Sequence, residues 1–117
     1  MSPPLVLVAE DDPELRELVA LTLTDAGMEV EQARDGREAL EHVVAHKPDL
    51  VLLDMRMPVM DGRAFCDAIR TRGDPPPVVV MTAGDRAAQT AQELGAVSWL
   101  AKPFDIDDLV AAVRRSL

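Results

Sequence analysis

Five short apolar runs recur along this chain, and segments of helical periodicity separate them. The runs are Leu5–Ala9, Met28–Ala33, Leu50–Leu53, Val78–Met81 and Val97–Ala101. The first, third and fourth are nearly continuous in valine, leucine and similar residues, which is typical of parallel strands buried on both faces. The second alternates apolar with acidic residues, so we expect a half-exposed strand at the edge of a sheet.

The segments between these runs carry helix signals. Asp12 before Pro13 predicts a helix start, and Gly27, Gly73 and Gly95 predict three helix ends. The expected helical residues are Leu15, Leu18, Val19 and Thr22; Ala39, Leu40, Val43 and Val44, ending near Lys47-Pro48; Phe65, Ala68, Ile69 and Arg72; about Arg86 to Leu94; and Ile106, Leu109, Val110, Val113 and Leu117, capped by Asp105. Regular alternation of strands and helices predicts one α/β domain over residues 1–117, with a parallel sheet between two layers of helices.

Composition and charge exclude several classes of function. The net charge of −9 disfavours direct binding to nucleic acid or to an anionic membrane surface. Cys66 is the only cysteine, so no intramolecular disulfide can form, and we expect it to pack a helix. The start of the chain has no signal-peptide or membrane-span pattern, which predicts a cytoplasmic protein.

Polar residues stand where four of the predicted strands end. The first strand ends in Glu10-Asp11-Asp12, the third in Asp54, the fourth in Thr82 and the fifth in Lys102-Pro103. Ligands of such sheets bind beyond the carboxyl ends of the strands. Carboxylates gathered there repel one another unless a cation lies among them, and Mg²⁺ is the hard cation that oxygen ligands favour. No histidine or cysteine lies at these ends, which argues against zinc or copper there.

Asp54 is the residue of greatest chemical interest, because a carboxylate can act as a nucleophile towards phosphorus. Phosphoryl transfer requires that the charge on three oxygens be neutralised. A metal ion and Lys102 could each contact one of these oxygens, and either the Thr82 hydroxyl or nearby backbone N–H groups could contact the third.

The sequence resembles the response-regulator receiver domains of two-component signalling, which are CheY-like. The resemblance covers essentially all of the chain and rests on strings that are specific only in combination: Val8-Ala9-Glu10-Asp11-Asp12-Pro13, Val51-Leu52-Leu53-Asp54-Met55-Arg56-Met57-Pro58, Asp61-Gly62, Met81-Thr82-Ala83-Gly84, Leu94-Gly95-Ala96 and Trp99-Leu100-Ala101-Lys102-Pro103-Phe104. It implies a flavodoxin-like (βα)5 doubly wound sandwich with a five-stranded parallel sheet.

The resemblance also implies a role for each residue at the site. Asp54 is the phosphoacceptor, and the phosphodonor is the phosphohistidine of a histidine kinase. Mg²⁺ is held by Asp11, by Asp54, by the backbone carbonyl of Arg56 and, through water, by Glu10.

The remaining implied roles concern contacts and switching. Lys102 contacts the phosphoryl group and precedes Pro103 through a cis peptide bond. Thr82 moves towards the phosphoryl group, and Trp99 stands at the position of the switch aromatic residue, where the family usually has tyrosine or phenylalanine. Asp12 falls one place after the acidic pair of the family, and its position before Pro13 already predicts that it is a helix N-cap.

Partners follow from the same resemblance. The kinase docks near Leu15, Leu18 and Pro103, and a downstream protein or output domain reads the switch. Homodimers in the family use the fourth helix, fifth strand and fifth helix. The chain ends with its fifth helix, so we expect no DNA-binding or enzymatic output domain within it.

Other interpretations of the same residues remain open. An aspartyl-nucleophile phosphatase would need a second acid two positions after Asp54, where Arg56 stands. A receiver-like module could act by protein contact without phosphorylation. Thr82 could be an ordinary strand residue, and Trp99 could belong to the core. His42 and His46 are four apart on one helix, but without a third ligand in view exposed helix residues are the preferred interpretation.

Overall fold

The computed structural model describes residues 2–117 and contains one five-stranded parallel sheet. The elements are β1 (Leu5–Ala9), α1 (Pro13–Asp25), β2 (Glu29–Ala33), α2 (Gly36–His46), β3 (Leu50–Asp54), α3 (Gly62–Arg72), β4 (Val78–Ala83), α4 (Ala87–Leu94), β5 (Ser98–Lys102) and α5 (Ile106–Ser116). The strand order is β2-β1-β3-β4-β5, so the chain reverses its direction of winding between β1 and β3. The predicted flavodoxin-like sandwich is therefore confirmed.

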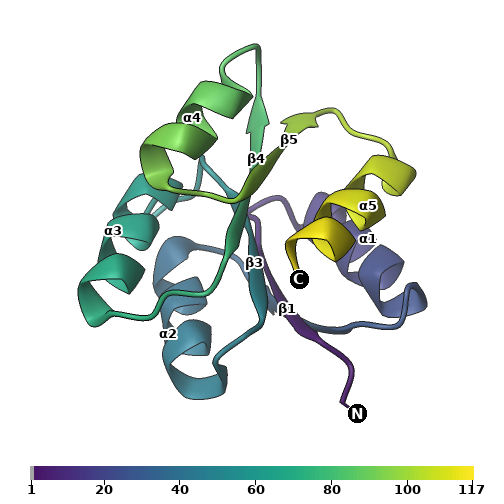
Figure 1. Cartoon of the computed structure of the whole chain (residues 1–117), viewed down its shortest axis with the longest axis horizontal. Helices are drawn as coiled ribbons and strands as arrows, with labels where there is room; N and C mark the ends of the chain where they lie inside the picture. Colours follow the sequence, from purple (N-terminus) through teal and green to yellow (C-terminus); the bar gives the residue numbers. More distant parts are fainter. Residues whose placement is uncertain (1) are drawn as a thin grey trace.

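Two helical layers enclose the sheet. Figure 1 shows α1 and α5 on one side and α2, α3 and α4 on the other. Each layer closes its own core, because successive residues of a strand point to opposite faces. Val8, Leu52 and Met81 pack beneath α1 and α5, whereas Leu7 and Phe65 belong to the opposite core.

Three predicted helix and strand features are confirmed in detail. The Asp12 carboxylate accepts hydrogen bonds from the backbone N–H groups of Glu14 and Leu15, as expected for the N-cap of α1. Strand β2 lies at the edge of the sheet, and four of its five residues are partly or fully exposed. Cys66 is buried on α3, and burial raises the pKa of its thiol to about 11, which makes it a packing residue.

Other expectations were wrong in part. Four residues of three predicted apolar stripes face outwards: Leu18, Val44, Ile106 and Leu117 are 51%, 44%, 53% and 47% exposed. Asp105 occupies the N-cap position of α5 but makes no side-chain capping hydrogen bond. Strands β3 and β5 end at Asp54 and Lys102 as predicted, whereas β4 continues one residue past Thr82, because Ala83 still pairs with Lys102.

A close backbone contact joins α2 to the loop that follows β3. The Gly36 N–H donates a hydrogen bond to the Met60 carbonyl oxygen at 3.0 Å. A Cβ atom at Gly36 would lie 2.1 Å from that oxygen, so only glycine permits the approach. The loop after Asp54 is thereby held against the helical layer.

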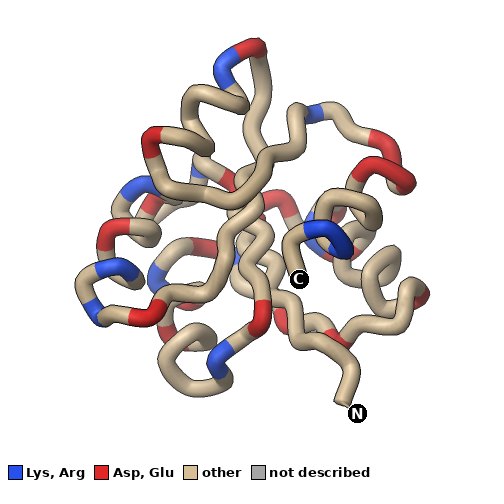
Figure 2. Tube along the Cα trace, in the orientation of Figure 1, with Lys and Arg blue, Asp and Glu red and all other residues tan. Residues whose placement is uncertain are grey.

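Charged residues are spread over the molecule. Figure 2 shows lysine and arginine scattered over several helices and loops. Within residues 2–117, none of the helices combines the length and apolar character that crossing a membrane requires.

Candidate functional site

Three of the predicted site residues share one face of the sheet. Glu10, Asp54 and Lys102 each follow, two positions later, a strand residue that packs beneath α1 and α5. The alternation of side chains therefore directs all three to that face, at the carboxyl ends of β1, β3 and β5. Strand β4 lies between β3 and β5, and the long Lys102 side chain spans this gap.

Lys102 joins the two buried carboxylates. Its Nζ donates a hydrogen bond to Glu10 Oε1 at 2.6 Å and another to Asp54 Oδ1 at 3.2 Å. The Glu10 and Asp54 side chains are only 1% and 6% exposed, against 24% for Lys102. The second Glu10 oxygen accepts the backbone N–H of Asp12 at 3.3 Å. The ammonium is thus fixed in position at the Asp54 carboxylate.

Burial and charge shift the proton affinities of this cluster. Burial raises the pKa of the Glu10 carboxyl to about 7; the hydrogen bond from Lys102 opposes this effect and the neighbouring Asp54 adds to it. Partial burial lowers the pKa of Lys102, but its hydrogen bond to Glu10 and the negative charge of Asp54 outweigh burial, so the pKa lies above its usual value. Lys102 therefore stays charged, and Glu10 can take up a proton near neutral pH.

The third carboxylate completes a group of oxygen donors. Glu10, Asp11 and Asp54 each offer a carboxylate oxygen, and these atoms lie within 4.8 Å of one another. Asp11 itself is exposed at the mouth of the site. A single ammonium cannot balance all three carboxylates, and the donors are hard oxygen atoms, so the group fits Mg²⁺. The role of the Arg56 carbonyl as a further ligand stays a prediction.

Thr82 and Trp99 lie on the opposite face. Trp99 of β5 pairs with Val80 of β4, which lies in the core that α2, α3 and α4 cover. Thr82 follows Val80 by two positions, so the Thr82 and Trp99 side chains are near neighbours on that face. The Thr82 hydroxyl donates to the Ala83 carbonyl oxygen at 3.4 Å and is not part of the Lys102 cluster. Trp99 is 47% exposed, so its interpretation as a core residue is wrong.

The Lys102–Pro103 peptide bond is cis, as the family resemblance implies.

The raised pKa of Glu10 predicts how stability depends on pH. Without metal, the folded state holds the Glu10 proton up to about pH 7, whereas the unfolded chain releases it near 4.5. The folded state thus binds more protons in this window, and the free energy of unfolding should fall by roughly 2–3 kcal/mol from pH 4.5 to 7.5. Urea unfolding in EDTA measures this slope.

The Glu10→Gln variant is the control for that slope, because glutamine keeps the side-chain shape without a titrating group. Its free energy of unfolding should vary much less with pH over the same range. The shifted pKa values of Lys102 and Cys66 lie above this window, and the lowered pKa of Glu31 affects stability only at more acidic pH. An equal slope in both proteins would contradict the assignment to Glu10.

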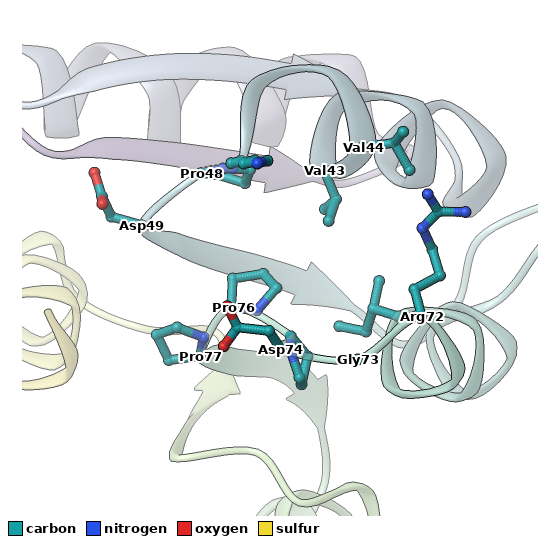
Figure 3. Close-up of a pocket in the computed structure, with 12 residues that line it drawn as sticks. Val43, Val44, Pro48, Asp49, Arg72, Gly73, Asp74, Pro76 and Pro77 are labelled. Carbon is teal, nitrogen blue, oxygen red and sulfur yellow. The ribbon is translucent and has the colours of Figure 1, made fainter.

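A separate cavity lies at the other end of the sheet. It has a volume of about 560 Å³, and Figure 3 shows that the α2–β3 and α3–β4 connections line it, with Asp49, Arg72 and Pro76 among the lining residues. None of the predicted site residues borders it. A smaller hollow of about 270 Å³ lies between α1 and α5, next to Lys102, and its walls are largely apolar.

Comparisons with known proteins agree with this geometry. Residues 6–114 match the family described as "Response regulator receiver domain". The chain is 40% identical over 117 residues to the response regulator MprA of Mycolicibacterium vanbaalenii, a match that covers 98% of this chain and 51% of that protein. It is also 40% identical over 114 residues to MprA of Mycobacterium leprae, covering 96% of this chain and 50% of that protein. The chain thus spans about half the length of these curated relatives.

Solved structures give the same result. The chemotaxis protein CheY4 of Vibrio cholerae has a TM-score of 0.91 and 36% identity, with 99% of this chain and 100% of that chain covered. The receiver domain of NtrX from Brucella abortus has a TM-score of 0.88 and 34% identity, with 96% and 97% covered.

Proposed function

The chain belongs to the response regulator receiver domain family, and on that premise we propose that its Asp54 carboxylate accepts a phosphoryl group from the phosphohistidine of a histidine kinase. The contact between Lys102 Nζ and Asp54 Oδ1, at 3.2 Å within a buried strand end, is the observation that carries this proposal. An ammonium held there can neutralise a phosphoryl oxygen without any rearrangement of the strands.

The transfer exchanges one bond for another. An Asp54 oxygen attacks the phosphorus atom, a new O–P bond forms, and the P–N bond to the donor imidazole breaks. The electron pair of the broken bond stays on the imidazole nitrogen. Lys102 then exchanges part of its contact with the carboxylates for a contact with a phosphoryl oxygen, while Glu10 keeps the ammonium in place.

Mg²⁺ is the cofactor we infer. Asp11 and Asp54 would hold it directly, with the Arg56 carbonyl as a third protein ligand and Glu10 acting through water. Bound Mg²⁺ supplies positive charge that offsets the carboxylates and the incoming phosphoryl oxygens. The three carboxylate oxygens within 4.8 Å of one another support this assignment.

The consequence of phosphorylation is a change of conformation rather than substrate turnover. Self-catalysed phosphoryl transfer and slow autodephosphorylation are the only chemistry we assign to the chain. Thr82 moves towards the phosphoryl group, and Trp99 responds as its neighbour on the same face. The surface formed by α4, β5 and α5 then controls a downstream protein or output domain, and a homodimer through this surface would use the same switch.

The kinase docks on the hollow between α1 and α5. Leu18 and Ile106 border this hollow and are 51% and 53% exposed, although both are large and apolar. Lys102 and Pro103 form its edge towards the site, so a helix of the partner seated there would bring its phosphohistidine to Asp54. A cytoplasmic location remains a prediction from the sequence.

Beryllofluoride binding tests the proposal. Beryllofluoride mimics a phosphoryl group and binds by coordination to a carboxylate oxygen. With Mg²⁺ present, the unmodified chain should bind it saturably and the fluorescence of Trp99, the only tryptophan, should change. Asp54→Asn should show no saturable binding, because its amide is a poor ligand for beryllium.

Asp61→Asn is a matched control, since asparagine caps α3 as aspartate does and Asp61 lies outside the cluster. It should bind beryllofluoride as the unmodified chain does. If Asp54→Asn bound with unchanged affinity, the assignment of the phosphoacceptor would be wrong. A chain that responds to neither Mg²⁺ nor beryllofluoride would instead be a receiver-like module that acts by protein contact alone.

A further inference from the structure

A second group of metal-binding side chains lies between β2 and α2, away from the phosphoacceptor site. His42 Nδ1 lies 2.6 Å from Glu31 Oε1, and His46 Nδ1 lies 2.8 Å from the same oxygen. The two imidazole rings have centroids 5.8 Å apart and an interplanar angle of 62°. Three donor atoms from two elements therefore converge on one point. The preferred interpretation from the sequence was that both are exposed helix residues; His46 is exposed, His42 is only partly exposed, and Glu31 is the third donor that was not in view.

The fold explains why these side chains meet. Glu31 pairs in register with Leu7, whose side chain lies in the core beneath α2 and α3, so Glu31 faces α2 from the edge strand. His42 and His46 are four residues apart on α2 and therefore share one side of that helix. The alternation of apolar and acidic residues at 28–33 indicated that the side chains of this strand point to two faces. It did not indicate which helix packs against the face that carries Glu31.

We propose that Glu31, His42 and His46 form a binding site for a divalent transition-metal ion, for which Zn²⁺ is the best match. Two imidazole nitrogens and one carboxylate oxygen are the protein ligands that zinc accepts when its fourth position stays open to water. The bound ion would join the edge strand β2 to α2.

The geometry requires only a small adjustment. Zinc binds nitrogen and oxygen at about 2.0–2.2 Å, which places tetrahedral donor atoms about 3.3 Å apart. The present separations of 2.6 and 2.8 Å would have to increase by about 0.7 and 0.5 Å, within the reach of a glutamate side-chain rotation. Each imidazole would carry its single proton on Nε2 when the ion is bound at Nδ1.

Exposure and charge also suit a metal ion. The side chains of Glu31 and His42 are 26% and 25% exposed, and that of His46 is 54% exposed, so an ion can enter from solvent. Partial burial raises the pKa of Glu31, but the hydrogen bonds from both histidines outweigh it, and the pKa lies below its usual value.

Calorimetric titration with Zn²⁺ in excess Mg²⁺ tests the proposal, because Mg²⁺ occupies the oxygen site and leaves the histidines free. The unmodified chain should bind one Zn²⁺. His42→Gln and His46→Gln should each weaken the affinity by at least about tenfold, since even the loss of a group behind a metal ligand costs about 10–100-fold. Glu41→Gln, an exposed neighbour on α2, and Asp11→Asn, in the other site, should bind zinc as the unmodified chain does.

Nitrogen NMR of the imidazoles in the unmodified chain gives a readout that needs no variant. Zinc should shift the Nδ1 resonances of both histidines and leave the protons on Nε2. Unchanged zinc affinity in the His42→Gln, His46→Gln double variant would overturn the proposal. So would zinc binding that Asp11→Asn abolishes, or imidazole resonances that zinc leaves unmoved.

Discussion

Replacing Lys102 with methionine is expected to slow phosphorylation of the chain by acetyl phosphate by a factor on the order of 100. Methionine keeps much of the side-chain volume but removes the ammonium that lies 3.2 Å from Asp54 Oδ1. Removing one positioned donor to a developing negative charge typically costs about 100–1,000-fold in rate. The measurement is the initial rate of phosphoprotein formation, followed by intact-protein mass spectrometry.

Two further variants separate the lost contact from a lost fold. Lys47→Met removes the only other lysine, which lies at the C-terminus of α2, and should phosphorylate normally. Lys102→Arg keeps the charge and should restore most of the stability, but its planar guanidinium cannot reproduce the geometry of the ammonium, so the rate should stay low. A normal rate in Lys102→Met would show that the ammonium does not act on the phosphoryl group.

Loss of Asp11 should have an effect of similar size through the metal. In Asp11→Ala we expect the affinity for Mg²⁺ to fall by at least about tenfold, a loss of 1.4 kcal/mol or more in binding free energy. Phosphorylation should slow to the rate that the unmodified chain shows in EDTA. Titration with Mg²⁺, monitored by Trp99 fluorescence and by phosphorylation rate, measures both effects.

Asp12→Asn is the matched control, because it removes the adjacent carboxylate while asparagine still caps α1. It should keep the Mg²⁺ affinity and the rate of the unmodified chain. Equal losses of Mg²⁺ affinity in Asp11→Ala and Asp12→Asn would indicate that the overall negative charge of this segment attracts the ion. Asp11 would then not be a specific metal ligand. A rate in Asp11→Ala that still depends fully on Mg²⁺ would contradict the assignment.

The convergence of Glu10, Asp54 and Lys102 could be predicted because it follows from strand order and from the position of each residue at a strand end. Continuous valine and leucine runs mark buried parallel strands, and the carboxyl ends of such strands meet at one edge. Which face of the sheet each side chain points to could be determined only from the strand register. The sequence therefore placed Thr82 correctly at the end of the fourth strand. Only the structure shows that its side chain lies on the face opposite the Lys102 cluster.

Residues at the sheet edges were harder to predict. Trp99 is large and apolar, which favours burial, but β5 is an edge strand and α4 spans only eight residues. The contact of Glu31 was missed for a similar reason, because an acidic residue in a short alternating run is expected to face solvent. Its contact with His42 depends on how α2 crosses the edge of the sheet, and no local pattern reports that crossing.

Covalent mapping of the phosphoryl group tests the central claim most directly. After incubation with acetyl phosphate and Mg²⁺, borohydride reduction converts a phosphorylated aspartate to homoserine, which peptide mass spectrometry can locate. Homoserine should be found at position 54 and at no other aspartate. Homoserine at Asp11 or Asp12, or a peptide 50–54 that stays unmodified while the chain gains a labile phosphoryl group, would contradict Asp54 as the acceptor.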